Sequence, residues 1–192
     1  MLRARMTARR LPLLLACVAL AMGLSACNKH KVLTEASTEG PFINVGPLDY
    51  QVQISRQLNP ADPEDHAYLA GLPGGTAMQP PKGQVWFAVF MRVQNVTKQT
   101  QTPTTQFVIR DTQGQEYRPI PLDPKVNPFA YVATPLGPGD VNPNPESIAA
   151  NGPVQQGSLL LFKLKTASLQ NRPLMLIMQD GAGHEATVAL DL

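Results

Sequence analysis

Residues 84–118 read QVWFAVFMRVQNVTKQTQTPTTQFVIRDTQGQEYR, and this stretch decides the predicted fold. Its first run, 85–93, is apolar on both faces until Arg92, where the pattern becomes amphipathic. A strand that is covered on both faces has such a continuous apolar run, whereas a strand with one solvated face alternates. We therefore predict a central β-strand that ends near Asn95 and buries Val89.

The second half of the stretch predicts a β-hairpin. Residues 105–110 place Phe107 on one face of a strand, and we expect this ring to be buried. The sequence Asp-Thr-Gln-Gly at 111–114 then supplies turn residues, with a glycine that is suited to a positive φ. The returning strand, 115–120, contains Pro119, which cannot donate a ladder hydrogen bond and therefore indicates that this strand lies at a sheet edge or stops early.

Four more segments carry strand patterns, which brings the predicted total to about seven short strands. The clearest is 48–55, where apolar and polar residues alternate. The other three are 158–165, 174–179 and 185–192. Short strands separated by turn signals are typical of an all-β sandwich, which we predict as one domain over residues 48–192.

Two insertions interrupt the predicted strands. The first, 57–83, contains a helix signal, because Asp62 can cap a helix and Pro63 suits its first position. We expect two helical turns from Pro63 to about Ala70, with acidic residues in the first turn. The second insertion, 121–153, is long and rich in proline, and loops of this length are usually functional or disordered.

The N-terminus has the organisation of a secretory signal. Four arginines precede an apolar run at 11–22, which is shorter than the roughly 20 residues that a membrane-spanning helix needs. The next residues, Leu24-Ser25-Ala26-Cys27, resemble the lipobox of bacterial lipoproteins, in which the signal is cut before a cysteine that carries diacylglycerol. We predict a lipoprotein signal peptide at 1–26 and lipidation of Cys27; an ordinary secreted protein with an incidental Cys27 is the alternative.

These assignments divide the chain into the signal peptide, a tether and the folded domain. Residues 27–47 comprise the lipidated Cys27 and a polar segment broken by Gly and Pro, which we expect to be flexible. Its twenty residues after the cysteine extend to at most roughly 66 Å. Two or three buried acyl chains hold a protein on a membrane for practical purposes permanently. The predicted location is therefore the extracytoplasmic face of the cell membrane, with the membrane itself as a partner.

Cysteine count and charge exclude several functions. The chain has 2 cysteines, and Cys17 leaves with the signal while Cys27 would be consumed as the lipid thioether. An internal disulfide, a nucleophilic cysteine and a thiolate metal site are therefore not expected. Without the four arginines of 1–26, the 16 basic residues fall to 12 against 14 acidic residues. No basic field remains to recruit nucleic acid, and we expect no cofactor.

The stretch 84–118 also resembles the signature of telokin-like extracellular domains in bacterial lipoproteins. In that family an apolar strand ends in Asn, here Asn95, and a later strand leads to Asp-x-x-Gly and an aromatic residue, here Asp111, Gly114 and Tyr117. The closing part, 156–178, fits as well. The resemblance implies an immunoglobulin-like β-sandwich and surface exposure, and it implies no established catalytic residues. The two insertions depart from the minimal family pattern.

Three groups of residues could form a chemical site. The cluster Asp62, Glu64, Asp65 and His66 could bind a divalent metal, but an acidic first helical turn explains it better. Two methionines and a histidine near the C-terminus could bind copper, although a spacing of three places those methionines on opposite faces of a strand. Ser158 lacks the Gly-x-Ser-x-Gly context of a hydrolase nucleophile.

The sequence thus predicts a lipid-anchored lipoprotein that acts as a binding or scaffolding module at the cell surface, and not as an enzyme. The alternatives are a hydrolase or carbohydrate-active accessory domain that uses the insertion loops, and a metal carrier. We predict binding of a protein or cell-envelope partner through Phe129 and Tyr131, because aromatic residues in a loop supply contact area. The competing interpretation is that both rings fold back and cover a sandwich edge.

Overall fold

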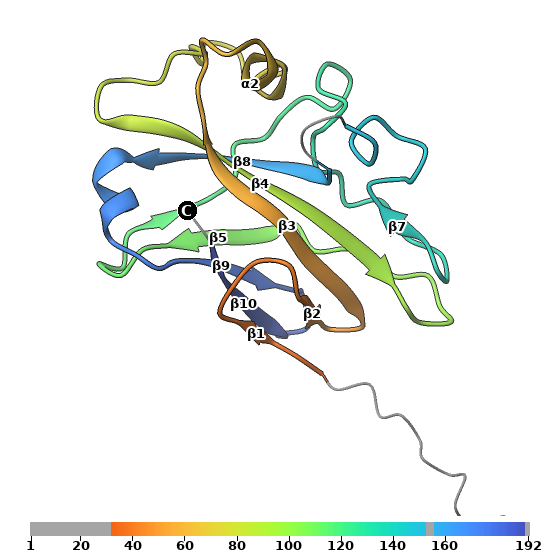
Figure 1. Ribbon diagram of the computed structural model, residues 1–192. Helices are drawn as coiled ribbons and strands as arrows, with labels where there is room; N and C mark the ends of the chain where they lie inside the picture. Colours follow the sequence, from red (N-terminus) through yellow and green to blue (C-terminus); the bar gives the residue numbers. More distant parts are fainter. Residues whose placement is uncertain (1–31, 153–155, 191–192) are drawn as a thin grey trace, which may run out of the picture. The chain divides into compact units, whose positions relative to one another are not determined.

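The computed structural model describes residues 32–152 and 156–190, whose strands form two packed sheets (Figure 1). The first sheet contains, in order across it, β1 (Glu35–Ala36), β10 (Glu185–Leu190), β9 (Leu174–Gln179), β5 (Gln106–Arg110) and β6 (Glu116–Tyr117). The second contains β2 (Phe42–Val45), β3 (Leu48–Leu58) and β4 (Gln84–Asn95), with β7 (Val141–Asn142) and β8 (Ser158–Lys165) both paired to β4. The predicted all-β, immunoglobulin-like sandwich is confirmed.

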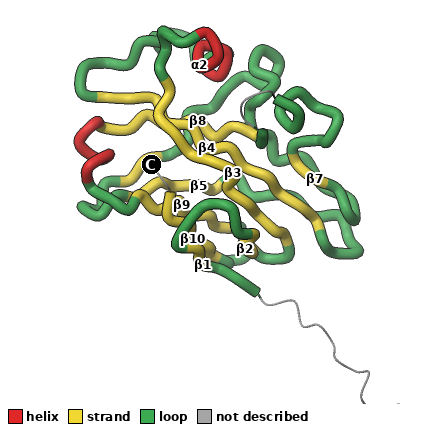
Figure 2. Tube along the Cα trace, viewed as in Figure 1, coloured by secondary structure: helices red, strands yellow, loops and turns green. Residues whose placement is uncertain are grey.

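Helix is confined to two short pieces of the described chain (Figure 2). These are α2 (Pro63–Tyr68), in the first insertion, and the 3-10 helix η2 (Thr166–Gln170), which follows β8. The seven predicted strands correspond to β3, β4, β5, β6, β8, β9 and β10, and the predicted helix corresponds to α2. The strands β1, β2 and β7 were not predicted.

The surroundings of β4 explain why the run 85–93 is apolar on both faces. Residues at odd positions, including Val89, point into the core between the two sheets, where Phe107 of β5 also lies. Residues at even positions, including Trp86 and Phe90, form a second apolar cluster on the outer face of the sheet. Tyr68, from the end of α2, is part of that second cluster, so the first insertion covers the outer face of β4.

The folded domain begins earlier than predicted. Strand β2 pairs with β3 and buries Ile43 and Val45 in the core, so residues 27–47 are not a tether along their whole length. The backbone N–H of Leu33 donates to Asn44 Oδ1 at 2.8 Å, and the N–H of Asn44 donates to the Leu33 carbonyl at 2.6 Å. The boundary placed at residue 48 was wrong, because glycines and prolines on both sides masked the alternating Phe-Ile-Asn-Val of β2.

The turn between β2 and β3 requires glycine. Gly46 has a φ of +58°, and a Cβ atom there would lie 2.6 Å from Asp180 Oδ2. Asp180 begins the turn between β9 and β10, which belong to the other sheet. The β2–β3 turn and the β9–β10 turn therefore meet at one end of the sandwich, where the described chain also begins (Figure 1).

Truncation of a core ring tests this strand assignment. Phe107 is 2% exposed and belongs to the core between the sheets. We expect Phe107→Ala to lower the free energy of unfolding by about 3–5 kcal/mol, measured by denaturant titration. Val108→Ala, on the half-buried opposite face of β5, is the matched control and should cost about 1 kcal/mol or less. Equal effects of the two substitutions would contradict the assignment.

Candidate functional site

A groove with a volume of about 410 Å³ lies between β5 and β8. We call it the β5–β8 groove and define it by its lining, which is residues 105–107, 118–122, 130–131 and 159–161. Small-molecule sites in proteins have volumes of about 300–1,000 Å³ and mostly apolar walls with a few polar groups. The β5–β8 groove meets both conditions and is the best candidate binding site in the described part of the chain.

The groove exists because the chain leaves one sheet for the other. Strand β6 pairs with β5 only at Ile109–Tyr117 and Arg110–Glu116. The same register would next bring Pro119 opposite Phe107, but proline has no N–H to donate. The chain turns away instead, and the N–H of Ile120 donates to the Leu161 carbonyl of β8 at 2.7 Å. A wedge of space therefore remains between β5 and the departing chain.

The lining of the β5–β8 groove is apolar apart from its rim. Ile120, Leu159 and Leu161 supply aliphatic side chains, and Tyr131 supplies a ring. Among the described residues that line the groove, Arg118 is the only one with a charged side chain. The groove thus has one cation and no carboxylate in its lining.

The second insertion forms the far wall by covering the edge of β8. The N–H of Leu159 donates to the Phe129 carbonyl at 2.7 Å, and the N–H of Tyr131 donates to the Leu159 carbonyl at 3.0 Å. Ala130 is thereby paired with Leu159 as a short parallel bridge. An uncovered strand edge exposes unpaired backbone groups to other chains. Residues 129–131 satisfy the N–H and the carbonyl of Leu159 on this edge of β8.

Tyr131 is fixed in place by contacts with the core. Its ring meets the Phe107 ring edge-on, with the centroids 5.2 Å apart, and its hydroxyl donates to the Thr104 carbonyl at 2.9 Å. Tyr50 lies next to it and accepts a hydrogen bond from the Thr104 N–H. Burial raises the pKa of Tyr131 well above its usual value and raises the pKa of Tyr50 to about 12. Both hydroxyls are therefore neutral structural groups at physiological pH.

Phe129, in the second insertion, packs against the first insertion. Its ring meets the Tyr68 ring edge-on, with the centroids 4.9 Å apart. Close by, the Asn127 side-chain amide donates to the carbonyls of Tyr68 and Ala70, each at 3.0 Å. Gly71 allows this approach, because a Cβ atom at its φ of +72° would lie 2.9 Å from the Asp123 carbonyl oxygen. Phe129 and Tyr131 are both half-buried and each packs against an apolar cluster, as the edge-cover interpretation describes. Binding of a partner through these two rings stays a prediction.

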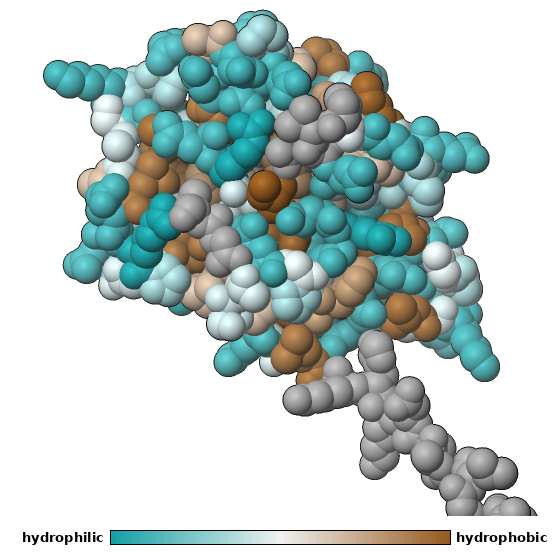
Figure 3. All heavy atoms as spheres, in the orientation of Figure 1, coloured by the Kyte–Doolittle hydropathy of each residue, from teal (hydrophilic) through white to brown (hydrophobic). Residues whose placement is uncertain are grey.

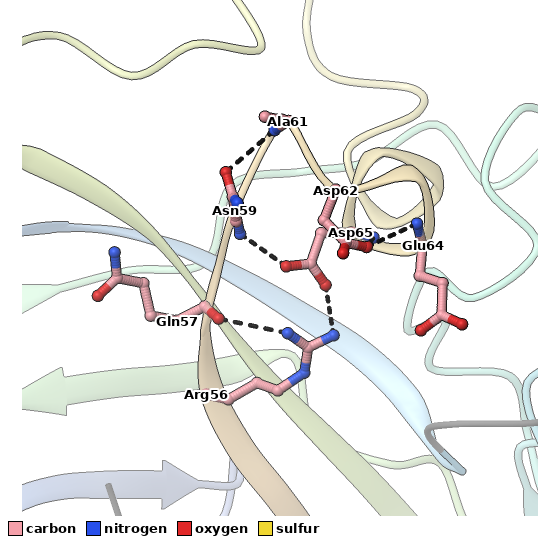
Figure 4. Close-up of polar contacts among 7 residues, drawn as sticks. All are labelled: Arg56, Gln57, Asn59, Ala61, Asp62, Glu64 and Asp65. Carbon is pink, nitrogen blue, oxygen red and sulfur yellow. Dashed lines mark hydrogen bonds and ion pairs between the residues drawn. The ribbon is translucent and has the colours of Figure 1, made fainter.

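The acidic cluster of the first insertion starts helix α2 and joins it to β3 (Figure 4). Asp62 caps the helix by accepting hydrogen bonds from the N–H groups of Glu64 and Asp65. Asp65 is buried and forms an ion pair with Arg56 of β3, and it also accepts a hydrogen bond from the Asn59 N–H at 2.6 Å. These contacts are structural, and they match the helix-start interpretation of the cluster.

The two methionines considered as copper ligands lie on opposite faces of β9. Met178 is fully buried in the core between the sheets, whereas Met175 is half-buried on the other face. His184 contacts Asp180 instead, with 2.7 Å between Nδ1 and Oδ2. Desolvation opposes ionisation of Asp180, but hydrogen bonds from the His184 ring and backbone outweigh it and lower the carboxyl pKa. Within the described residues, no three His, Cys, Asp or Glu side chains gather as a metal site.

The predicted lipidation site, Cys27, and the signal peptide, 1–26, lie outside the residues that the structure describes. Over 32–152 and 156–190, no helix combines the length and apolar character that crossing a membrane requires. On the face of the domain shown in Figure 3, apolar residues are scattered in small groups among hydrophilic ones. Scattered exposed apolar residues are normal for a protein surface, so this face offers no large docking patch.

The fold and the groove define the chain as a β-sandwich protein with a lateral apolar groove. No protein-family model and no curated protein matches the sequence. Among solved structures, the yjhA protein from Bacillus subtilis is similar at 11% identity and a TM-score of 0.47, covering 81% of this chain and 99% of that one. A conserved hypothetical protein from Bacillus anthracis is similar at 10% identity and a TM-score of 0.45, and the match covers 79% of this chain and 94% of that one. An uncharacterized β-sandwich protein from Clostridium difficile 630 is similar at 12% identity and a TM-score of 0.43, and the match covers 84% of this chain and 98% of that one.

The edge cover predicts a loss of stability when both aromatic rings are removed. We expect the double substitution Phe129→Ala, Tyr131→Ala to lower the free energy of unfolding by about 3 kcal/mol or more, because both rings pack on apolar clusters. Thermal melting followed by circular dichroism measures the change. Val132→Ala, at a neighbouring side chain that is 41% exposed, is the control and should leave the melting temperature nearly unchanged. An unchanged melting temperature in the double variant would refute the edge-cover role.

Proposed function

We propose that the protein is a membrane-anchored extracytoplasmic lipoprotein whose β-sandwich domain is a binding module. The observation that carries the binding role is the β5–β8 groove, an apolar hollow of about 410 Å³ with one cationic residue, Arg118, on its rim. Binding sites commonly combine an apolar wall with a few polar groups that fix the orientation of the ligand.

The anchor is proposed from the N-terminal sequence. A basic segment, a short apolar run and Leu24-Ser25-Ala26-Cys27 stand in the order that lipoprotein signals have. Lipidation of Cys27 would hold the mature chain at the membrane, because each buried CH₂ group contributes about 0.8 kcal/mol. The likeness of residues 84–118 to telokin-like extracellular domains supports the same placement.

The early start of the folded domain leaves only a short link to the proposed anchor. Six residue steps lead from Cys27 to Leu33, which is hydrogen-bonded to Asn44 of β2. Six residues span at most about 21 Å, roughly a third of the reach expected for the longer tether. We therefore propose that the end of the sandwich with the β2–β3 turn lies near the bilayer.

The geometry of the insertions favours binding over hydrolysis. An active site built from both insertions would bring titratable side chains together in one concave site. The two insertions do meet, but through the Asn127 amide and the ring contact of Phe129 with Tyr68. The carboxylates of Asp62 and Asp65 serve the helix cap and the ion pair with β3. A hydrolase or a metal carrier therefore has less support than a binding module.

Substitution of the lipobox cysteine tests the anchor. We expect the wild-type protein to enter the detergent phase of a phase-separating nonionic detergent, and Cys27→Ser to carry no lipid mass. Intact-mass measurement of the mature chain identifies both lipidation and cleavage, which matters because an uncleaved signal would also hold the variant in the detergent phase. Cys17→Ser is the matched control, since Cys17 lies in the signal and its loss should change neither mass nor partitioning. A wild-type mature chain without added lipid mass would contradict the anchor.

A further inference from the structure

We infer that the β5–β8 groove binds the apolar chain of an anionic amphiphile, with Arg118 contacting the charged head group. This inference deepens the proposed function and rests on it, because it names the class of ligand for the groove that was proposed as the binding site. Four features of the described residues carry the inference: the apolar wall, an adjoining polar hollow, an uncompensated charge and the position of the groove in the domain.

The wall suits a hydrocarbon chain. Ile120 and Leu122 line one side, and Leu159 and Leu161 of β8 line another. Burying a hydrocarbon chain against such side chains contributes about 0.8 kcal/mol for each CH₂ group removed from water. The groove contains no buried charge that would oppose entry of an apolar chain, since its one ionisable cation, Arg118, is exposed.

A second, polar hollow adjoins the groove. It has a volume of about 170 Å³ and lies on the outer side of β5, where Arg110 and Gln179 contribute to its lining. Gln106 and Arg118 line both the groove and this polar hollow. An amphiphile needs an apolar space and a polar space that share a border, and Arg118 lies on that border.

The charge at the border favours an anionic head group. Of the described residues that line the two hollows, only Glu116 has a carboxylate, and its Oε1 accepts hydrogen bonds from Arg110 Nε at 2.9 Å and Nη2 at 2.6 Å. Arg118 has no carboxylate partner among the described residues. A guanidinium without a carboxylate partner can bind the carboxylate or phosphate of a ligand through two parallel N–H···O bonds.

The groove begins near the end of the domain where the described chain starts. Gln106, at the start of the groove wall, pairs with Gln179, and Asp180 follows directly in the turn that contacts Gly46. Leu33 is tied to the same end through Asn44. With the proposed anchor at Cys27, at most about 21 Å of chain separates the lipid from Leu33, which keeps the start of the groove within reach of amphiphiles at a membrane surface.

Fluorescence titration with a dansyl-labelled undecanoic acid tests the inference. The chain from residue 27 onward, with Cys27→Ser, is free of detergent and keeps the whole described domain, which forms a compact unit by itself. We expect saturable binding that Arg118→Glu weakens about tenfold or more, because a bidentate contact becomes a repulsion. Lys125→Glu makes the same charge change at an exposed site outside both hollows, and it should alter the affinity by less than about twofold.

Two further measurements separate the contribution of the ligand's head group from that of its hydrocarbon chain. The methyl ester of the same probe should bind more weakly than the acid to the wild type, and Arg118→Glu should not weaken it further. Ala130→Trp should fill the groove and abolish binding of both probes, with a melting temperature close to that of the parent chain. Acid and ester bound equally, or an acid affinity that Arg118→Glu leaves unchanged, would overturn the inference.

Competing occupants give different results in the same experiments. If the groove holds a second copy of the chain, the parent sediments as a dimer that Ala130→Trp dissociates, and this outcome overturns the amphiphile. If the groove holds an apolar protein segment, neither probe shows saturable binding, and this outcome also overturns the amphiphile. Because the protein tested carries no lipid, these results do not depend on lipidation of Cys27, and failure of the anchor is detected separately by intact mass.

Discussion

The outer edge of β8 is the constraint on which the rest of the domain depends. One side of β8 pairs with β4 over eight consecutive residues, from Ser158 to Lys165. The other side would present unpaired N–H and C=O groups, which invite pairing with other chains. Ile120 and residues 129–131 satisfy the N–H and carbonyl of Leu159 and the carbonyl of Leu161 with hydrogen bonds of 2.7–3.0 Å. The covering segments in turn pack against the first insertion, and the sheet, the helix and both insertions form one connected structure.

The same covering creates the candidate binding site. A chain that continued as β6 would close the space beside β5, but Pro119 cannot extend that pairing and Ile120 pairs with β8 instead. The β5–β8 groove is the space left by this crossing, and Arg118 lies just before it. The departure of the chain from β5 at residues 118–120 therefore accounts for the cover at Leu161 and for the apolar groove that Arg118 borders.

Local patterns in the sequence were sufficient for much of the fold. Strand β3 was predictable from its alternation, β4 from its continuous apolar run and α2 from its Asp-Pro start, because each signal lies within a few residues. Strand β2 was missed because Phe-Ile-Asn-Val is short and lies between glycines and prolines. The site was harder to predict. Tyr131 was singled out for its aromatic ring, and it does line the groove, but through packing on Phe107 and not through exposure. Arg118 carries no local signal, since the role proposed for it depends on Glu116 being bound by Arg110.

Amide hydrogen exchange measured by NMR on the folded domain tests the central claim most directly. The account predicts that the amides of Ile120, Tyr131 and Leu159 exchange as slowly as those of the β4–β8 ladder, because their hydrogen bonds open only when the sandwich opens. The amide of the exposed neighbour Val132 should exchange much faster. Exchange of Ile120, Tyr131 and Leu159 at the rate of Val132, with β4 still protected, would show that the edge of β8 is not covered and would contradict the account.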